Sequence, residues 1–204
     1  MRTKTKQAIA AITATAAIAM STGAVAGEPG QWIFRVGAHD VAPKSRNHDV
    51  VNVDAGKTLT FNLTRIFNEH WGVEILAALP FEHDVNLNGG GKVADVKHLP
   101  PTVSLQYHFA REARVRPYVG AGLNATIFFS EHTTGALAGT ELKLDTSFGA
   151  AAQAGIDVDL SAHWFLNADA RWMDIDTDAT LNGASLGAVQ IDPLAIGVTI
   201  GRRF

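Results

Sequence analysis

The sequence predicts an all-β fold, an eight-stranded antiparallel transmembrane β-barrel with short periplasmic turns and four longer extracellular loops. Three observations lead to this prediction. The C-terminal stretch alternates strictly between large apolar residues and small or polar ones. Long and short connections alternate between eight such stretches along the chain. The N-terminus has the composition of an export signal.

The C-terminal stretch, residues 192–204, has the period of a strand rather than of a helix. One face carries Leu194, Ile196, Val198 and Ile200, and the other carries Ala195, Gly197, Thr199, Gly201 and Arg203. In a membrane barrel the apolar face meets lipid and the small, polar face fills a narrow lumen. An ordinary strand of a soluble β protein is the alternative, and it would turn the Leu and Ile face inward.

The N-terminus is expected to be a cleaved signal peptide, residues 1–26. Arg2, Lys4 and Lys6 form a positive segment before an Ala-, Ile- and Thr-rich run, and Ala24-Val25-Ala26 supplies small residues for cleavage. The run is too weakly apolar for a retained membrane helix, which needs roughly 20 strongly apolar residues. Residues 27–204 are then expected to form the barrel as one domain.

Charge and cysteine content narrow the possible functions. The chain has 204 residues, a formal net charge of −3 and no cysteine. Removing the three cations of the signal peptide leaves about −6, which argues against a nucleic-acid partner. An exported domain without disulfides needs another source of stability, and closing a sheet on itself is one.

The expected strands are joined by connections that alternate in length. Long connections are expected at 43–56, 80–99, 130–144 and 174–189, and the second of them includes the glycine-rich tip Asn88–Gly91. With the N-terminus on the periplasmic side, all long loops fall outside the cell and all short turns inside. The strands are expected at 31–41, 58–66, 71–79, 100–109, 117–129, 146–160, 164–173 and 192–204.

Aromatic residues gather near the predicted periplasmic strand ends, as in an interfacial girdle. They are Trp32, Trp71, Tyr107, Phe109, Trp164 and Phe204. The terminal aromatic Phe204 also resembles the C-terminal signal of outer-membrane barrels, so the outer-membrane assembly machinery is an expected partner of this strand.

The chain resembles the OmpW family of eight-stranded outer-membrane proteins along its whole mature length. The motifs that carry the resemblance are Arg35–Ala38, Val41–Pro43, Trp71–Glu74, Ala77–Phe81, Lys97–Thr102, Arg116–Asn124 and Trp172–Thr177. Two departures are Arg202 and Arg171, at positions that family members often fill with aromatics. The resemblance implies an outer-membrane channel or receptor for passive passage of small, hydrophobic molecules, with outer-membrane lipid around it.

The inward-facing positions of the predicted strands carry many polar and charged residues. An eight-stranded barrel has an interior just wide enough for side chains, so these groups should pair and plug the lumen. The alternative is that they form a polar floor beneath an external pocket. The predicted lumen-lining residues are Arg35, His39, Glu74, Gln106, His108, Gln153, Asp157, Asp159, Asn167, Asp169 and Arg171.

The polar-floor alternative would place a possible lateral opening in the barrel wall near Pro80, Pro100 and Pro101. These prolines lie near the outer ends of two neighbouring strands, where missing N–H groups would weaken the hydrogen-bonded ladder. Substrate could then leave an external pocket sideways into the bilayer.

Other functions are weaker alternatives. Catalysis is not expected, because His83, His98, His132 and Asp174 show no Ser–His–acid spacing and loop histidines are usually solvated. No metal site or cofactor is expected, because the histidines are scattered. A structural or adhesive anchor with a plugged lumen and loops that bind host or phage partners remains open, as does a soluble lipocalin-like binder.

Overall fold

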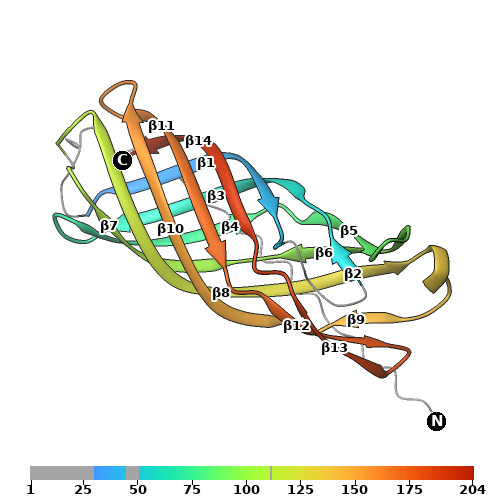
Figure 1. Ribbon diagram of the computed structural model, residues 1–204. Coiled ribbons are helices and arrows are strands. Elements are labelled where there is room, and N and C mark those ends of the chain that lie inside the picture. The colour runs from blue at the N-terminus through green and yellow to red at the C-terminus, as the bar shows by residue number, and fades with distance from the viewer. Residues whose placement is uncertain (1–29, 45–50, 111) are drawn as a thin grey trace, which may run out of the picture.

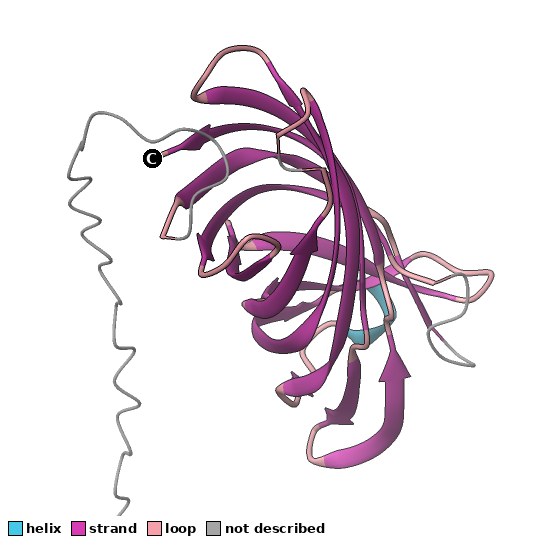
Figure 2. Cartoon of the chain, turned by 90° about the vertical axis from the view of Figure 1, so that its left-hand side faces the viewer, coloured by secondary structure: helices cyan, strands magenta, loops and turns pink. Residues whose placement is uncertain are grey.

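The computed structural model describes residues 30–44, 51–110 and 112–204, and the proposed signal peptide lies outside them. Eight antiparallel strands form a closed barrel (Figures 1 and 2). Within these residues no helix is long and apolar enough to cross a membrane. The barrel strands are β1 (Trp32–Ala42), β3 (Gly56–Ile66), β4 (Trp71–Ala78), β7 (Thr102–His108), β8 (Val115–Thr133), β10 (Ser147–Asp159), β11 (Trp164–Met173) and β14 (Leu194–Arg203).

The barrel closes through strands that are far apart in the sequence. Each strand pairs with its neighbours in the chain order, and β1 pairs with β14 from Ile33–Arg203 to Ala42–Leu194. All of these pairings are antiparallel, so no edge of the barrel is left open. The eight predicted strands and the predicted closed topology are confirmed.

The apolar faces of the strands point outward. In β14, Leu194, Ile196, Val198 and Ile200 are 42–61% exposed, whereas Ala195 and Thr199 are buried. The same alternation runs through β3 and β4. A row of exposed Leu, Ile and Val around a buried polar interior is the pattern of a barrel that lipid surrounds.

The long connections carry secondary structure, which the sequence reading missed. They form β2 (Val51–Val53), β5 (Phe81–Leu87), β6 (Lys92–Leu99), β9 (Leu142–Leu144), β12 (Asp176–Leu181) and β13 (Ala184–Gln190), with a short 3-10 helix η1 (Gly135–Leu137). Their assignment as plain loops was wrong. Together with the outer half of β8 they extend the barrel at the end away from the C-terminus (Figure 1), and we call this part the extension.

The extension consists of two sheets. The first continues the barrel wall, because β6, β5 and β2 add in that order to the outer half of β8. The second sheet has the order β13-β12-β9 and no ladder pairing with the first within the described residues. The β12–β13 hairpin turns at Asn182 and Gly183, which have φ angles of +50° and +83°. Two successive positive φ angles are what a tight two-residue hairpin turn requires.

Candidate functional site

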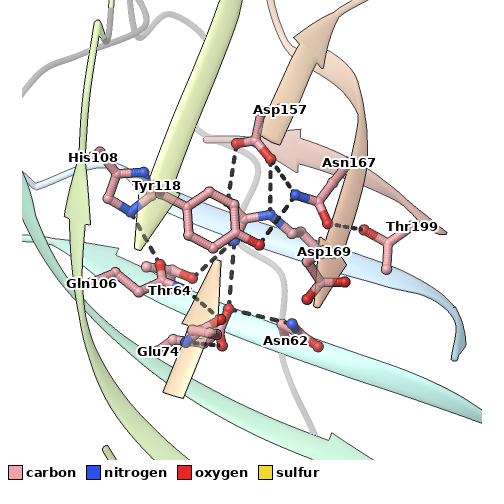
Figure 3. A network of polar contacts seen from close by, with 12 residues as sticks. Asn62, Thr64, Glu74, Gln106, His108, Tyr118, Asp157, Asn167, Asp169 and Thr199 are labelled. Atoms are coloured by element: carbon pink, nitrogen blue, oxygen red, sulfur yellow. Dashed lines mark hydrogen bonds and ion pairs between the residues drawn. The ribbon is translucent and has the colours of Figure 1, made fainter. Parts of the chain in front are cut away.

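The barrel interior is filled by one polar network (Figure 3). Arg35 lies at its centre and is fully buried. Its Nε donates to Asp157 Oδ1 at 3.3 Å, its Nη2 donates to Asp157 Oδ2 at 3.0 Å, and its Nη1 lies 3.6 Å from Glu74 Oε2. The guanidinium is also stacked between the rings of Tyr118 and Phe165, at 5.0 and 5.3 Å from their centroids. Arginine is held here by two carboxylates and two aromatic faces, so its charge is fully compensated.

A second arginine joins the outer half of the network. Arg171 Nη1 donates to Glu74 Oε1 at 2.7 Å, and its Nε donates to Asp169 Oδ2 at 2.5 Å. Asp169 Oδ1 in turn lies 2.7 Å from His39 Nε2, and Thr60 Oγ1 lies 2.9 Å from His39 Nδ1. Four strands therefore contribute to one chain of contacts across the lumen.

The inner end of the network closes the barrel near the short turns. Arg203 Nη1 donates to Asp159 Oδ1 at 2.7 Å, and Arg116 forms a further ion pair with Asp159. Arg203 also lies 4.0 Å from the centroid of Phe165. The network as a whole pairs four arginines with four carboxylates, which are Arg35, Arg116, Arg171 and Arg203 with Glu74, Asp157, Asp159 and Asp169.

All the polar residues selected from the sequence lie in this interior. Ten of them are buried, and Asp159 is partly buried at the rim. Gln153 donates to Glu74 at 3.1 Å, Gln106 donates to Gln153 at 3.3 Å, and His108 Nε2 lies 3.0 Å from Gln106 Oε1. The sequence selection missed Arg116, Arg203, Tyr118 and Phe165. All four have the inward parity of their strands, which was the available signal.

Inward glycines make room for the large side chains of the network. A Cβ built on Gly201 would lie 2.1 Å from Phe165 Cζ, and one built on Gly197 would lie 2.3 Å from the His39 ring. Such distances are far below van der Waals contact, so only glycine fits at these two positions.

Met173 separates the polar network from an apolar region above it. It lies two residues beyond Arg171 on the same face of β11, and its Sδ is 3.7 Å from Asn124 Nδ2. On its other side it packs in a buried apolar cluster with Ala151, Ile175, Ala179, Val189 and Ile191. The interior thus changes from charged to apolar at this layer.

The extension encloses an apolar cavity of about 270 Å³ between its two sheets. The walls include Val85, Val96 and Phe128 from the first sheet, and Leu144 and Val189 from the second. The polar residues in the lining are two histidines, His83 and His98. A cavity of this kind fits a small ligand that buries apolar surface.

The two histidines are buried, which corrects the expectation that they are solvated. Both are 4% exposed, and their rings stack with centroids 5.0 Å apart. His83 Nδ1 lies 2.5 Å from the Asp54 carbonyl oxygen. Burial lowers the pKa of His98 to about 3, with a further contribution from His83, and burial also lowers the pKa of His83. The cavity wall is therefore uncharged at neutral pH.

The barrel wall has an interrupted ladder at the three prolines selected from the sequence. Pairing between β4 and β7 ends at Leu76–Thr102, and pairing between β5 and β6 starts at Phe81–His98. No ladder pair joins the described residues 77–80 to residues 99–101, and these segments contain Pro80, Pro100 and Pro101. Each segment is still hydrogen-bonded to the strand on its other side. Leu79 N donates to Leu59 O, and Ala125 N donates to Pro101 O. Pro100 lines a small cavity of about 20 Å³ beside Met173.

One acidic cluster lies at the base of the second sheet. Asp174, Asp176 and Asp192 bring carboxylate oxygens within 4.8 Å of one another. Asp192 is paired with Lys44 Nζ at 2.8 Å, and it accepts a hydrogen bond from the Ile175 backbone at 3.1 Å. These contacts tie the ends of the connecting segments together.

Comparisons with known proteins agree with this architecture. The OmpW family model matches residues 28–204. Outer membrane protein W of Vibrio cholerae is 37% identical, over 98% of this chain and 100% of that protein. The crystal structure of OprG from Pseudomonas aeruginosa is 33% identical with a TM-score of 0.80, covering 88% of this chain and 98% of that one. The dibenzothiophene metabolism operon protein PahQ of Pseudomonas aeruginosa is 28% identical, over 87% of this chain and 90% of that protein.

Proposed function

Because the chain belongs to the OmpW family and is an outer-membrane β-barrel, we propose that it provides passive passage for small hydrophobic molecules across the outer membrane. The observation that carries the proposal is the apolar cavity of about 270 Å³ in the extension. A small apolar molecule entering it loses contact with water and gains about 25 cal/mol for each Å² buried. One relative, PahQ, is named for a dibenzothiophene metabolism operon. Dibenzothiophene is an apolar aromatic molecule, which supports this choice of solute.

The lumen is a poor route for such a molecule. Below Met173, the solute would have to displace arginines and carboxylates that compensate one another. Separating a buried ion pair leaves uncompensated charge and costs about 3–5 kcal/mol. Water-soluble solutes face the same plug. The polar network therefore acts as a floor beneath the cavity.

The interrupted ladder offers the alternative exit. It lies between the β4–β7 pair and the β5–β6 pair, in the connecting segments that contain Pro80 and Pro100–Pro101, and Pro100 lies beside Met173. Separating residues 77–80 from residues 99–101 would break no ladder pair, because none joins the two segments. We propose that the solute leaves sideways through this gap into the acyl chains of the outer membrane, so that its apolar surface never crosses the polar interior.

A structural or adhesive anchor is the second candidate, and the closed lumen favours it. An anchor needs a rigid barrel and exposed loops, and it needs no transport. The two functions differ in one measurable property, because only a conduit raises the permeability of a membrane toward apolar solutes.

Substitutions on opposite faces of β12 test the proposal. Leu181 lines the cavity, whereas its neighbour Thr180 does not and pairs with Lys143 across the sheet. Both Leu181→Asp and Thr180→Asp introduce a carboxylate. Proteoliposomes are assayed for entry of the apolar fluorophore N-phenyl-1-naphthylamine. A neutral polar group facing an apolar site costs about 1–3 kcal/mol and a carboxylate costs more, so Leu181→Asp should slow entry by at least about tenfold.

The Thr180→Asp variant should transport at the wild-type rate. Equal rates for the two variants would remove the cavity from the route. If wild-type proteoliposomes take up the fluorophore no faster than protein-free liposomes, the anchor becomes the better description. Folding of each variant is checked by heat-modifiable migration on a gel.

A further inference from the structure

The periplasmic rim carries an arginine on the lipid-facing side of the barrel. Arg202 continues the outward row of Leu194, Ile196, Val198 and Ile200 on β14, and it is partly buried. A cation at the end of an apolar row lies at the level of the lipid headgroups, where long side chains extend toward the interface.

Aromatic rings hold this guanidinium on two sides. Arg202 Cζ lies 5.5 Å from the Trp164 centroid and 4.8 Å from the Phe204 centroid. Trp164 on β11 is the cross-strand partner of Arg202, and Phe204 lies two residues after Arg202 in the chain. The guanidinium is therefore fixed in place before any ligand binds, which reduces the entropy cost of binding.

Arg202 lacks the anionic partner that the inward-facing rim arginines Arg116 and Arg203 have. Arg116 and Arg203 face inward and pair with Asp159. Within residues 30–44, 51–110 and 112–204, Arg202 forms no ion pair, and its buried Nε has no hydrogen-bond partner. The positive charge of Arg202 therefore has no anionic partner among these residues, and an anion that reaches the exposed part of its side chain would be favoured.

A second outward arginine lies close by on the same rim. Arg65 on β3 is stacked on Trp32 with its Cζ 4.9 Å from the ring centroid, and it donates to the Gly30 carbonyl oxygen. Trp32 and Phe204 are joined by two backbone hydrogen bonds. The rim from β11 to β3 thus presents two arginines and three aromatic rings to the headgroup region.

We propose that Arg202, flanked by Trp164 and Phe204, forms a binding site for the phosphate of a glycerophospholipid in the periplasmic leaflet. The phosphodiester accepts hydrogen bonds from the guanidinium, and the aromatic rings contact the glycerol and upper acyl region. Arg65 adds a second positive charge on the same rim. This site is separate from the cavity in the extension, and its function does not depend on transport.

Lipid binding to the folded full-length chain tests the site. Detergent-solubilised wild type, Arg202→Gln and the control Lys143→Gln are titrated with phosphatidylglycerol, and bound lipid is counted by native mass spectrometry. Lys143 lies on the extension and is paired with Glu141, so its loss removes the same charge far from the rim. An arginine near the membrane surface contributes about a factor of five to binding. Arg202→Gln should therefore raise the dissociation constant about fivefold, and Lys143→Gln should leave it unchanged.

Further arms separate the lipid from other anions and from folding defects. Inorganic phosphate at the same concentration should not displace the lipid, since it lacks the acyl chains that contact the rings. Displacement by phosphate would overturn the lipid assignment, as would equal binding by the two variants. If Arg202→Gln fails to refold, Trp164→Leu, which keeps the charge and removes one ring, takes its place with the same expected direction. Unchanged lipid binding in that variant would also overturn the site.

Discussion

Replacing Glu74 by glutamine should destabilise the barrel strongly. The Glu74 carboxylate accepts hydrogen bonds from Arg171 at 2.7 and 3.5 Å, from Gln153 at 3.1 Å and from Asn62 at 3.3 Å, and it lies 3.6 Å from Arg35. It is 1% exposed. The amide keeps the shape of the side chain but removes the charge, so four arginines then face three carboxylates. Loss of one partner from a buried ion pair costs about 3–5 kcal/mol.

The assay is equilibrium unfolding in urea, followed by tryptophan fluorescence in lipid vesicles. Glu82→Gln is the matched control, because Glu82 is paired with Lys97 at 3.6 Å on the surface of the extension and its side chain is 44% exposed. An exposed pair contributes about 0–1 kcal/mol. We expect Glu74→Gln to lower the free energy of unfolding by at least about 3 kcal/mol. Equal effects of the two substitutions would refute the idea that the network is a tightly coupled plug.

Two further predictions concern the buried histidines and an inward glycine. Exposed histidine has a pKa of about 6.5, whereas burial lowers the pKa of His98 to about 3 and that of His83 in the same direction. The opened extension therefore takes up protons that the closed one does not, and closure weakens as the pH falls from about 6.5 toward 3, by about 1.4 kcal/mol per pH unit for His98. The protection factors of the β5–β6 amides, which correct the hydrogen-exchange rates for their intrinsic pH dependence, should be lower at pH 5 than at pH 7.5, and equal protection factors would contradict this. Gly201→Ala places a Cβ against Phe165 and should cost about 1–3 kcal/mol in urea unfolding, whereas Gly91→Ala, with open space around it, should be neutral; equal stability of the two variants would refute the packing argument.

The barrel was predictable because alternation is strict in its strands. Leu194–Ile200 on β14 and Trp71–Ala77 on β4 keep one parity from end to end, and the membrane imposes this parity on every strand. Parity also selects Arg35 and Asp157 as inward residues. It does not say that they touch, because they are 122 residues apart and meet only through the register in which the barrel closes.

The extension was missed because its strands do not keep one parity. The ladder shifts register between Val85 and Asn86, between Asp95 and Lys97, and between Ala179 and Thr180. Each bulge adds a residue and reverses the faces beyond it, so period-2 counting fails there. Val93 and Ala94 are consecutive and both buried. The local signals in the sequence for hairpins in this region were Asn88–Gly89, between β5 and β6, and Asn182–Gly183, between β12 and β13.

The most direct test of the account compares two solutes in the same wild-type proteoliposomes. One is the apolar fluorophore N-phenyl-1-naphthylamine and the other is arabinose, a small polar sugar. The closed polar network and the apolar cavity together predict that the protein speeds entry of the fluorophore and leaves arabinose entry at the rate of protein-free liposomes. Rapid arabinose entry would mean that water-filled space runs through the lumen, and that result would contradict both the plug and the sideways route.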